Sequence, residues 1–280
     1  KPRGKLGVHF FSEAQLLEFH NWLLAERGNS SRTAATRFRQ MKTLWYWAST
    51  SAEYAEEVPR FINVEVPLFQ PPPRRLSPTW AQLDTILSRM MNARPTKRKV
   101  ASYRAAFVMR MTGLRATQAC ALNWEDISLD DGTLYIRGDI GKSSLERRGR
   151  LIPISPHLVS EAATWGRREG RLVGCNLKYP TLHSAIYRHI ERTADESLKE
   201  LLAGQSLHCF RRAFTSELVG RGAKRFAVEI LLGRSTGVGG DIYTDPRFVW
   251  DTLEDTVAMV TPYGAASDSS LDKRRLKIGP

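Results

Sequence analysis

Several features are scarce in this chain of 280 residues. Its three cysteines, Cys120, Cys175 and Cys209, are an odd number without CxxC spacing, which argues against a disulfide framework and against a zinc site. We expect all three to be small core residues in a reducing compartment. The longest apolar runs, such as residues 105–109, are far shorter than the ~20 residues that span a membrane. No signal or transit segment opens the chain, so we expect a soluble, cytoplasmic protein that does not bind membranes.

Two kinds of motif are also missing. The chain has no glycine-rich P-loop motif for a nucleotide. It has no cluster of carboxylates or histidines at ligand spacing, as a two-metal nuclease would need. We therefore expect neither a cofactor nor a metal. The first residue is Lys1 rather than Met, which we interpret as a sign that an upstream segment is missing.

Positive charge is abundant. The chain has 42 Lys and Arg against 29 Asp and Glu, a net charge of +13, and its hydrophobic content of 42% is high enough for buried cores. A folded chain with this excess points to a polyanionic partner, of which nucleic acid is the commonest. The alternative at this point is a protein that is basic without such a partner.

The first part of the chain has the pattern of a helical unit. A helix is expected from an N-cap at Ser12 to Gly28, and a second begins at Ser30 and Ser31. The second is expected to point Ala34, Ala35, Phe38, Met41, Leu44, Trp45 and Trp47 inward. Its four cations, Arg32, Arg37, Arg39 and Lys42, form either a solvated face or a face that contacts phosphates.

A proline-rich stretch, residues 67–76, is the best domain boundary, because four prolines prevent regular helix and favour an extended connector. We expect a helical N-terminal domain over 1–66, a second domain over 77–262 and a loose tail over 263–280. The second domain is expected to open with a helix capped by Ser77, with Pro78 at its first position.

In the second domain the pattern predicts mostly helices and one small sheet. A basic loop over 95–99 precedes a helix closed by Gly113. The apolar period then changes from 3.6 to 2, which predicts strands over 133–137 and 150–154, the second at a sheet edge because of Pro153. Further helices are expected over 182–190, 208–220, 226–232 and 248–260. The fold class is mainly α with a small antiparallel β-sheet (α+β).

Reactive residue types occur at four points of this domain. Arg115 follows a helix-ending glycine, Lys142 lies in the turn between the strands, His208 and Arg211 are spaced to share a helix face, and Tyr243 follows a glycine-rich loop. Each alone is weak evidence. A lone histidine at a helix start is more often a cap, and a lone tyrosine more often packs in a core.

Taken in order, these segments resemble the catalytic domain of the tyrosine recombinases, the phage-integrase and Xer family. The resemblance rests on Thr112-Gly-Leu-Arg115, Lys142, His208-Cys-Phe-Arg211, Leu231-Leu-Gly233 and Ile242-Tyr243. It implies a C-shaped clamp in which a helical, SAM-like core-binding domain precedes the catalytic domain. It also implies a site-specific recombinase or integrase that acts on double-stranded DNA. The active assembly would be a tetramer on two duplexes, with accessory DNA-bending proteins. Its source would be a bacterium, an archaeon, a phage or another mobile element.

The resemblance implies a role for each residue. Tyr243 would attack the phosphate and form a 3′-phosphotyrosyl link, which stores the bond energy without metal or ATP. Arg115 and Arg211 would bind the phosphate oxygens through their fixed guanidinium forks. Lys142 would protonate the leaving 5′ oxygen, and His208 would assist proton transfer or hold the phosphate.

Three positions depart from the family pattern. Arg234 stands where His or Trp is usual, and we still count it as catalytic because it can bond a phosphate oxygen. Gln118 replaces an acidic residue, and Arg212 replaces a second histidine. Two alternatives therefore stay open: a non-catalytic DNA-binding relative, and a monomeric DNA-relaxing enzyme of the topoisomerase type. The cations expected to contact DNA are Arg32, Arg37, Arg39, Lys42, Arg74, Arg75, Lys97, Arg98, Lys99, Arg147, Arg148 and Arg212.

Overall fold

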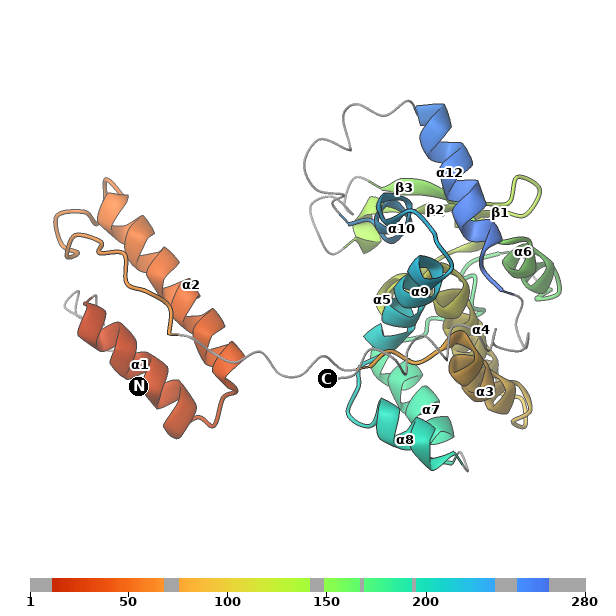
Figure 1. Ribbon diagram of the computed structural model, residues 1–280, viewed down its shortest axis with the longest axis horizontal. Coiled ribbons are helices and arrows are strands. Elements are labelled where there is room, and N and C mark those ends of the chain that lie inside the picture. Colours follow the sequence, from red (N-terminus) through yellow and green to blue (C-terminus); the bar gives the residue numbers. More distant parts are fainter. Residues whose placement is uncertain are drawn as a thin grey trace. The chain divides into compact units, whose positions relative to one another are not determined.

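The computed structural model describes residues 12–67, 76–141, 149–166, 169–192, 195–234 and 246–261, of which 246–248 are described by their backbone only. The chain divides into two compact units, residues 1–75 and 76–280, and each is considered by itself (Figure 1). Among the described helices, none is both long enough and apolar enough to span a bilayer.

The first unit is built on two helices that lie side by side, α1 (Glu13–Ala25) and α2 (Ser31–Thr50) (Figure 1). Both begin at the predicted caps: the Ser12 hydroxyl accepts from the Gln15 N–H, and the Ser30 hydroxyl from the Thr33 N–H, each at 3.3 Å. The core of the unit consists of Leu16, Phe38, Trp45, Ala48, Val58 and Val64.

Two residues of α2 that were predicted to point inward do not. Leu44 and Trp47 are 44% and 53% exposed, while Trp45 between them is 1% exposed and donates its indole N–H to the Pro59 carbonyl at 2.8 Å. At ~100° per residue, Trp47 lies ~200° around the helix from Trp45. A helix packed mainly on one side buries a single stripe, so the wide apolar surface of α2 is only partly covered.

The second unit is mainly helical around one small sheet (Figure 1). Strand β2 (Thr133–Ile136) pairs antiparallel with β1 (Ile127–Ser128) on one side and with β3 (Arg150–Pro153) on the other. This confirms the predicted fold class and the edge position of Pro153, and it adds β1. The helices are α3 (Trp80–Met91), α4 (Lys97–Thr112), α5 (Ala116–Ala121), α6 (Pro156–Ala163), α7 (Tyr179–Glu191), α8 (Glu196–Leu202), α9 (His208–Gly220), α10 (Arg225–Leu232) and α12 (Pro246–Ala258), with short 3-10 turns at Trp124–Asp126 and Gly138–Ile140.

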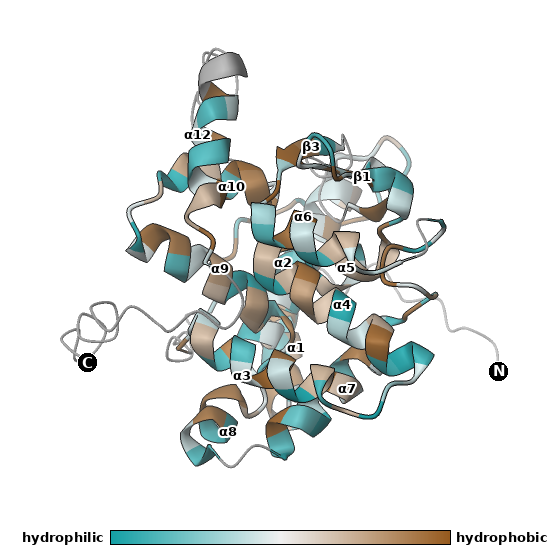
Figure 2. Ribbon diagram, turned by 90° about the vertical axis from the view of Figure 1, so that its right-hand side faces the viewer, coloured by the Kyte–Doolittle hydropathy of each residue, from teal (hydrophilic) through white to brown (hydrophobic). Residues whose placement is uncertain are grey.

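Helix α4 runs through the middle of this unit. Every residue from Ala101 to Thr112 is buried except Arg104, which is the pattern of a helix that is covered on all sides. It packs against α3, α5, α7 and α9. The outer helices bury one face each: α8 alternates between hydrophilic and hydrophobic residues (Figure 2), and its Leu198 and Leu202 are buried.

The start of α3 and the basic stretch before α4 were predicted wrongly. The cap of α3 is Thr79 rather than Ser77, because Thr79 and Gln82 form a reciprocal capping box with bonds of 2.8 and 3.1 Å. Residues 97–99 are the first turn of α4 rather than a loop, because the Thr96 hydroxyl accepts from the Lys99 N–H at 3.3 Å. Of the cysteines, Cys120 and Cys209 are buried as expected, whereas Cys175 is only partly buried.

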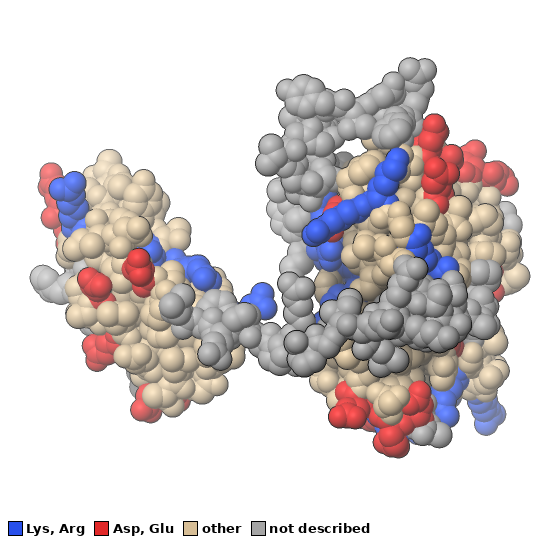
Figure 3. Space-filling view, in the orientation of Figure 1, with Lys and Arg blue, Asp and Glu red and all other residues tan. Residues whose placement is uncertain are grey.

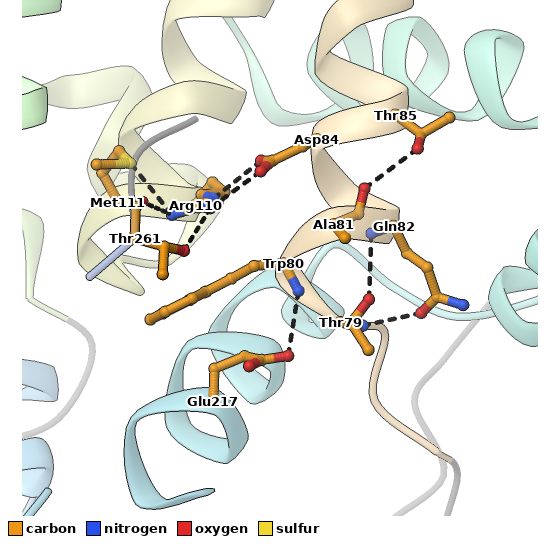
Figure 4. Close-up of polar contacts among 10 residues, drawn as sticks. All are labelled: Thr79, Trp80, Ala81, Gln82, Asp84, Thr85, Arg110, Met111, Glu217 and Thr261. Carbon is orange, nitrogen blue, oxygen red and sulfur yellow. Dashed lines mark hydrogen bonds and ion pairs between the residues drawn. The ribbon is translucent and has the colours of Figure 1, made fainter. Parts of the chain in front are cut away.

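A buried ion pair joins α3 to α4 (Figure 4). The Arg110 side chain has no exposed surface, and its Nε and Nη2 bond the two Asp84 carboxylate oxygens at 2.9 and 3.0 Å. Arg110 also donates to the Thr261 carbonyl at 2.8 Å, so the segment that follows α12 is tied to the same pair. The guanidinium lies 4.7 Å from the ring centre of Trp80, whose backbone N–H donates to Glu217 of α9 at 3.2 Å. This network holds four segments of the unit together.

Candidate active site

Arg115 is positioned by a sharp turn between α4 and α5. Gly113 ends α4 in the left-handed conformation, with φ of +66°, and a Cβ at this position would lie 2.6 Å from Cδ1 of Phe214. Leu114 is fully buried, and Arg115 is the residue that precedes α5. Glycine is therefore required here both by the backbone and by the close contact with α9.

Arg211 lies on the first turn of α9 and is fully buried. It donates to the carbonyl oxygen of Gly113 at 3.3 Å and to that of Leu232 at 2.5 Å. These carbonyls belong to the C-terminal ends of α4 and α10, where the helix dipole is negative. The guanidinium is thus stabilised in its buried position by the backbone dipoles of two helix ends.

Arg234 follows the glycine that ends α10. Gly233 has φ of +67°, and the next N–H, that of Arg234, donates to the Glu229 carbonyl at 2.9 Å. The Arg234 guanidinium forms an ion pair with the Glu229 carboxylate at 3.4 Å and stays about one third exposed. The turn therefore directs a partly exposed cation to the end of α10.

The pKa shifts place these residues in one electrostatic cluster. Burial, together with the charges of Arg115 and Arg234, lowers the pKa of Arg211 to about 9. The His208 side chain is partly exposed, and partial desolvation together with the charges of Arg211, Arg234 and Arg115 lowers its pKa to about 4. The pKa of Arg115 is lowered by burial and then by Arg234. His208 is therefore neutral at pH 7, next to a concentration of positive charge.

A further arginine, Arg150, belongs to the cluster and was missed by the sequence analysis. It opens β3, and its Nε and Nη2 bond the Leu231 carbonyl at 3.4 and 3.3 Å. Burial, together with the charge of Arg115, lowers its pKa to about 10. The alternation of side chains along β3 could have predicted that Arg150 points inward, because Arg150 shares a strand face with the buried Ile152 and Ile154.

The balance of charge in the cluster is strongly positive. Among the described residues, the one carboxylate that raises the pKa of Arg211 is Glu229. The cations are Arg115, Arg150, Arg211 and Arg234. Four cations and one carboxylate in a partly buried cluster give a positive potential, which is suited to bind an anion.

The two other departures from the family pattern have local contacts. The side-chain oxygen of Gln118 accepts from the Arg115 backbone N–H at 3.2 Å, so it fixes the start of α5. Arg212 donates to the side-chain oxygen of Gln205, whose amide nitrogen donates in turn to the Leu76 carbonyl at 3.2 Å. Arg212 therefore has a structural contact on α9.

The remaining predicted site residues are spread more widely. Arg32, Arg37 and Arg39 are exposed, whereas Lys42 donates to the Asn63 side chain at 2.8 Å and to the Val64 carbonyl. Lys97, Arg98 and Lys99 lie at the opposite end of α4 from Arg115, ~24 Å away for a helix of 16 residues. In the second unit, acidic side chains gather near α8, and Lys and Arg side chains lie across the middle (Figure 3). Six predicted site residues lie outside the described residues, namely Lys142, Tyr243, Arg74, Arg75, Arg147 and Arg148.

Comparison with known proteins identifies the class to which this fold and site belong. A family model described as the phage integrase family matches residues 81–248. The chain belongs to this family, which confirms the resemblance to the tyrosine recombinases.

Curated relatives are similar over different lengths. The tyrosine recombinase XerC of Xanthomonas campestris pv. campestris is 29% identical over 143 residues, 49% of this chain and 42% of its own. The chain therefore spans less than half the length of that relative. XerC of Chromobacterium violaceum is 26% identical over 231 residues, 79% of this chain and 72% of its own. XerD of Vibrio cholerae is 26% identical over 252 residues, 85% and 78% of the two chains.

Solved structures share the fold at low sequence identity. The Tn1549 transposon integrase in complex with transposon right end DNA has a TM-score of 0.64 at 16% identity, covering 99% of this chain and 89% of the other. The XerH site-specific recombinase, in a post-cleavage complex with a palindromic difH substrate, has a TM-score of 0.62 at 17% identity, covering 95% and 70%.

Proposed function

We propose that this protein cleaves and rejoins duplex DNA by transesterification, as a site-specific recombinase. The observation that carries the proposal is the positive cluster around Arg211, in which two helix ends hold a buried arginine through carbonyl oxygens at 2.5 and 3.3 Å. Such a site has a strong positive potential in a partly water-excluded position. A phosphodiester gains negative charge as it reacts, and fixed cations stabilise that charge best where water does not compete.

Arg115 and Arg211 would bind the two non-bridging oxygens of the scissile phosphate. Their guanidinium groups are planar forks with several donors, so Arg211 can keep its bonds to the two carbonyl oxygens and still face a phosphate oxygen. Arg234 would add a third cation from the end of α10, in place of a neutral donor. Its ion pair with Glu229 is partly exposed and spans 3.4 Å, so Arg234 can exchange that partner for a phosphate oxygen at modest cost.

His208 would act as the neutral group of the site. Its depressed pKa keeps one ring nitrogen able to accept a hydrogen bond at pH 7. A bound phosphate would offset the surrounding positive charge and raise the pKa of His208 toward its ordinary value. Histidine can therefore take up a proton only once the substrate is bound, which couples proton transfer to binding.

Tyr243 and Lys142 complete the proposed reaction. The phenol of Tyr243 gives its proton to His208 as its oxygen attacks phosphorus, the bond from phosphorus to the 5′ oxygen breaks, and Lys142 gives a proton to that oxygen. The products are a 3′-phosphotyrosyl link and a free 5′-hydroxyl. Attack by a 5′-hydroxyl reverses each step and restores the tyrosine, so one phosphodiester is exchanged for another without external energy.

Duplex DNA is the proposed substrate, with four copies of the chain on two duplexes and with accessory DNA-bending proteins. The solved structures that share the fold include complexes of a transposon integrase with transposon DNA and of XerH with its difH site. Those structures support DNA as the partner, and the relation to the transposon integrase is consistent with a role in DNA integration.

The test is covalent capture of DNA. Duplexes that the protein binds are first selected from a random-sequence pool. The enriched sequence is then made with a nick near its centre, so that the short fragment between the cut and the nick diffuses away and the strand cannot be rejoined. The wild-type protein is expected to form an adduct that resists denaturing electrophoresis, and Tyr243→Phe is expected to form none. An adduct that survives in Tyr243→Phe would assign the nucleophile to another residue.

The same capture experiment, together with a plasmid relaxation assay, separates the alternatives. Specific DNA binding without any adduct would overturn catalysis and favour a non-catalytic DNA-binding relative. Relaxation of supercoiled plasmids without a specific site, by a species that sediments as a monomer, would favour a topoisomerase-type enzyme.

A further inference from the structure

Arg150 is a largely buried arginine to which the proposed reaction gives no role. Its Nε and Nη2 donate to the carbonyl oxygen of Leu231, in the last turn of α10, at 3.4 and 3.3 Å. These bonds join the edge of the sheet to the end of a helix that is far away in sequence. The negative end of α10 favours a cation at this point.

The rest of the guanidinium lies under the glycine that ends α10. A Cβ at Gly233 would lie 2.4 Å from Nη1 of Arg150 and 2.6 Å from its Cζ. Nη1 is buried, and among the described residues it has no hydrogen-bond partner. The Arg150 guanidinium thus occupies the space that any side chain at position 233 would need.

The turn that rests on Arg150 positions two groups of the site. The Gly233 N–H donates to Ile230 at 2.8 Å, and the Arg234 N–H donates to Glu229 at 2.9 Å. The carbonyl of Leu232, next to the one bonded by Arg150, accepts from Arg211. One turn therefore directs Arg234 and holds Arg211, and the sequence then continues to Tyr243.

We propose that Arg150 is a positioning residue, which fixes the C-terminal turn of α10 against β3 by bonding the Leu231 carbonyl and packing under Gly233. It acts on the reaction through Arg211 and Arg234 and does not contact the phosphate, because Nη1 is enclosed beneath the turn. An apolar side chain would fill the same space without the cost of burying a cation beside other cations. It could not, however, bond the carbonyl that holds the turn in register.

The effect on cleavage rests on the proposed function, whereas the fixing of the turn does not. The experiment therefore has two readouts in the full chain. The first is the single-turnover rate of adduct formation compared with the dissociation constant for the selected DNA. The second is hydrogen exchange of the backbone amides of Gly233 and Arg234.

For Arg150→Ala we expect the adduct rate to fall at least ~10-fold while the dissociation constant changes less than ~3-fold, because the ground-state DNA contacts remain. The two amides should exchange at least ~10-fold faster, because their turn opens locally. Added guanidinium ion should restore part of the rate. Arg150→Lys keeps a positive charge and a single donor nitrogen, so it should give an intermediate result. It serves as the test if the alanine variant does not fold.

The matched control is Arg104→Ala. Arg104 is also a partly buried arginine that donates to a backbone carbonyl, that of Trp165, at 2.8 Å, and its guanidinium lies 5.1 Å from the Trp165 ring centre. Its loss should lower stability but leave the adduct rate, the exchange of the Gly233 and Arg234 amides and the response to guanidinium unchanged.

A double-mutant cycle tests the contact itself. Gly233→Ala should reduce the rate strongly in the wild type, where Cβ meets Arg150, and less in the Arg150→Ala background, where the space is vacant. Independent effects of the two changes would contradict the proposed contact.

Failure of this inference is distinguishable from failure of the proposed function. If the wild type forms no adduct, the function fails, and hydrogen exchange still tests Arg150. Unchanged exchange in Arg150→Ala would overturn the positioning role whether or not an adduct forms. A large loss of DNA affinity with unchanged exchange would make Arg150 a phosphate ligand instead, and faster exchange with an unchanged rate would remove it from the reaction.

Discussion

The Arg211 guanidinium donates through Nη2 to the carbonyl oxygen of Leu232, 2.5 Å away, at the C-terminal end of α10. A carboxylate in this position would cancel the charge of the arginine. A carbonyl at a helix C-terminus carries only part of a negative charge, so it stabilises the buried cation and leaves most of its field for a ligand. This relationship supports the proposed role of a fully buried arginine as a binding group for an anion.

The first prediction concerns the planar guanidinium group of Arg211. Arg211→Lys keeps a positive charge but replaces several fixed donors with one ammonium group, which cannot satisfy Gly113 and Leu232 and also face a phosphate. We expect the adduct rate to fall by about 10²-fold or more and the free energy of unfolding to fall by about 1–3 kcal/mol. Single-turnover kinetics and urea unfolding measure the two effects. Arg104→Lys, the control, should lower stability without a comparable loss of rate, and an unchanged rate in Arg211→Lys would contradict the proposed role.

The second prediction concerns pH. The pKa of His208 is about 4 in the folded chain against an ordinary value of 6.5, so between these values the unfolded chain binds more protons than the folded one. The contribution of His208 to stability is therefore fully present above pH 6.5 and is lost as the pH falls toward 4. Urea unfolding from pH 7 to 4 should show this loss, and His208→Gln should show a smaller dependence in the same window. The same slope in both proteins would assign the effect to other groups.

The third prediction concerns the turn that positions Arg115. In Gly113→Ala the left-handed backbone costs about 1–2 kcal/mol, and contacts of 2.6 Å with Phe214 and 2.8 Å with Leu232 add about 1–3 kcal/mol. Adduct formation should fall as well, since Arg115 and Arg211 both depend on this turn.

Gly204→Ala is the control for this change. Gly204 has a similar φ of +62°, but a Cβ there would have no neighbour within 4 Å. The free energy of unfolding of Gly204→Ala should therefore fall only by the cost of the left-handed backbone conformation. Equal losses at the two glycines would show that the contacts with Phe214 and Leu232 relax.

The fourth prediction concerns the buried ion pair shown in Figure 4. Asp84→Ala leaves Arg110, which has no exposed surface, without its carboxylate, and we expect a loss of about 3–5 kcal/mol of unfolding free energy. The exposed pair of Arg137 and Asp139, at 3.3 Å, is the control, and Asp139→Asn should cost less than about 1 kcal/mol. Thermal unfolding of the two variants checks the difference. A small loss in Asp84→Ala would mean that the Thr261 carbonyl and the Trp80 ring compensate.

The fifth prediction concerns DNA contacts of the first unit. At ~100° per residue, Arg32 and Arg39 lie on one side of α2, whereas Arg37 lies ~140° away from Arg32 and donates to Gln40 at 3.2 Å. Changing Arg32 and Arg39 to Gln should reduce the slope of log affinity against log salt by about 2, and Arg37→Gln should leave it unchanged. An unchanged slope in the double variant would assign that face of α2 to solvent.

Local patterns in the sequence predicted many elements well. Helix α9 begins at His208 and ends at Gly220, and α4 ends at Gly113, as the apolar spacing and the helix-ending glycine indicated. Strands β2 and β3 lie where the period changes to 2. These features depend on residues close together in the chain, and short-range spacing is sufficient to specify them.

Other predictions failed for different physical reasons. Leu44 and Trp47 are apolar but exposed, since the described residues of the first unit cover that side of α2 only in part. Helix α3 was expected to begin at a Ser77 cap, but the return bond from the Gln82 side chain to the Thr79 N–H makes Thr79 the cap. Helices α6 and α8 were not delimited, because they are short and their patterns are weak.

The sequence by itself determined the family, the main helices and the residues whose types suit phosphate chemistry. Only the tertiary structure decided how Arg115, Arg211, His208 and Arg234 meet, and that Arg150 lies among them. The reason is that the site is assembled from the ends of α4 and α10, the start of α9 and the first residue of β3. The negative helix ends that hold its arginines are brought together only when those elements pack. No spacing along the chain encodes that Arg150 fills the space beneath Gly233.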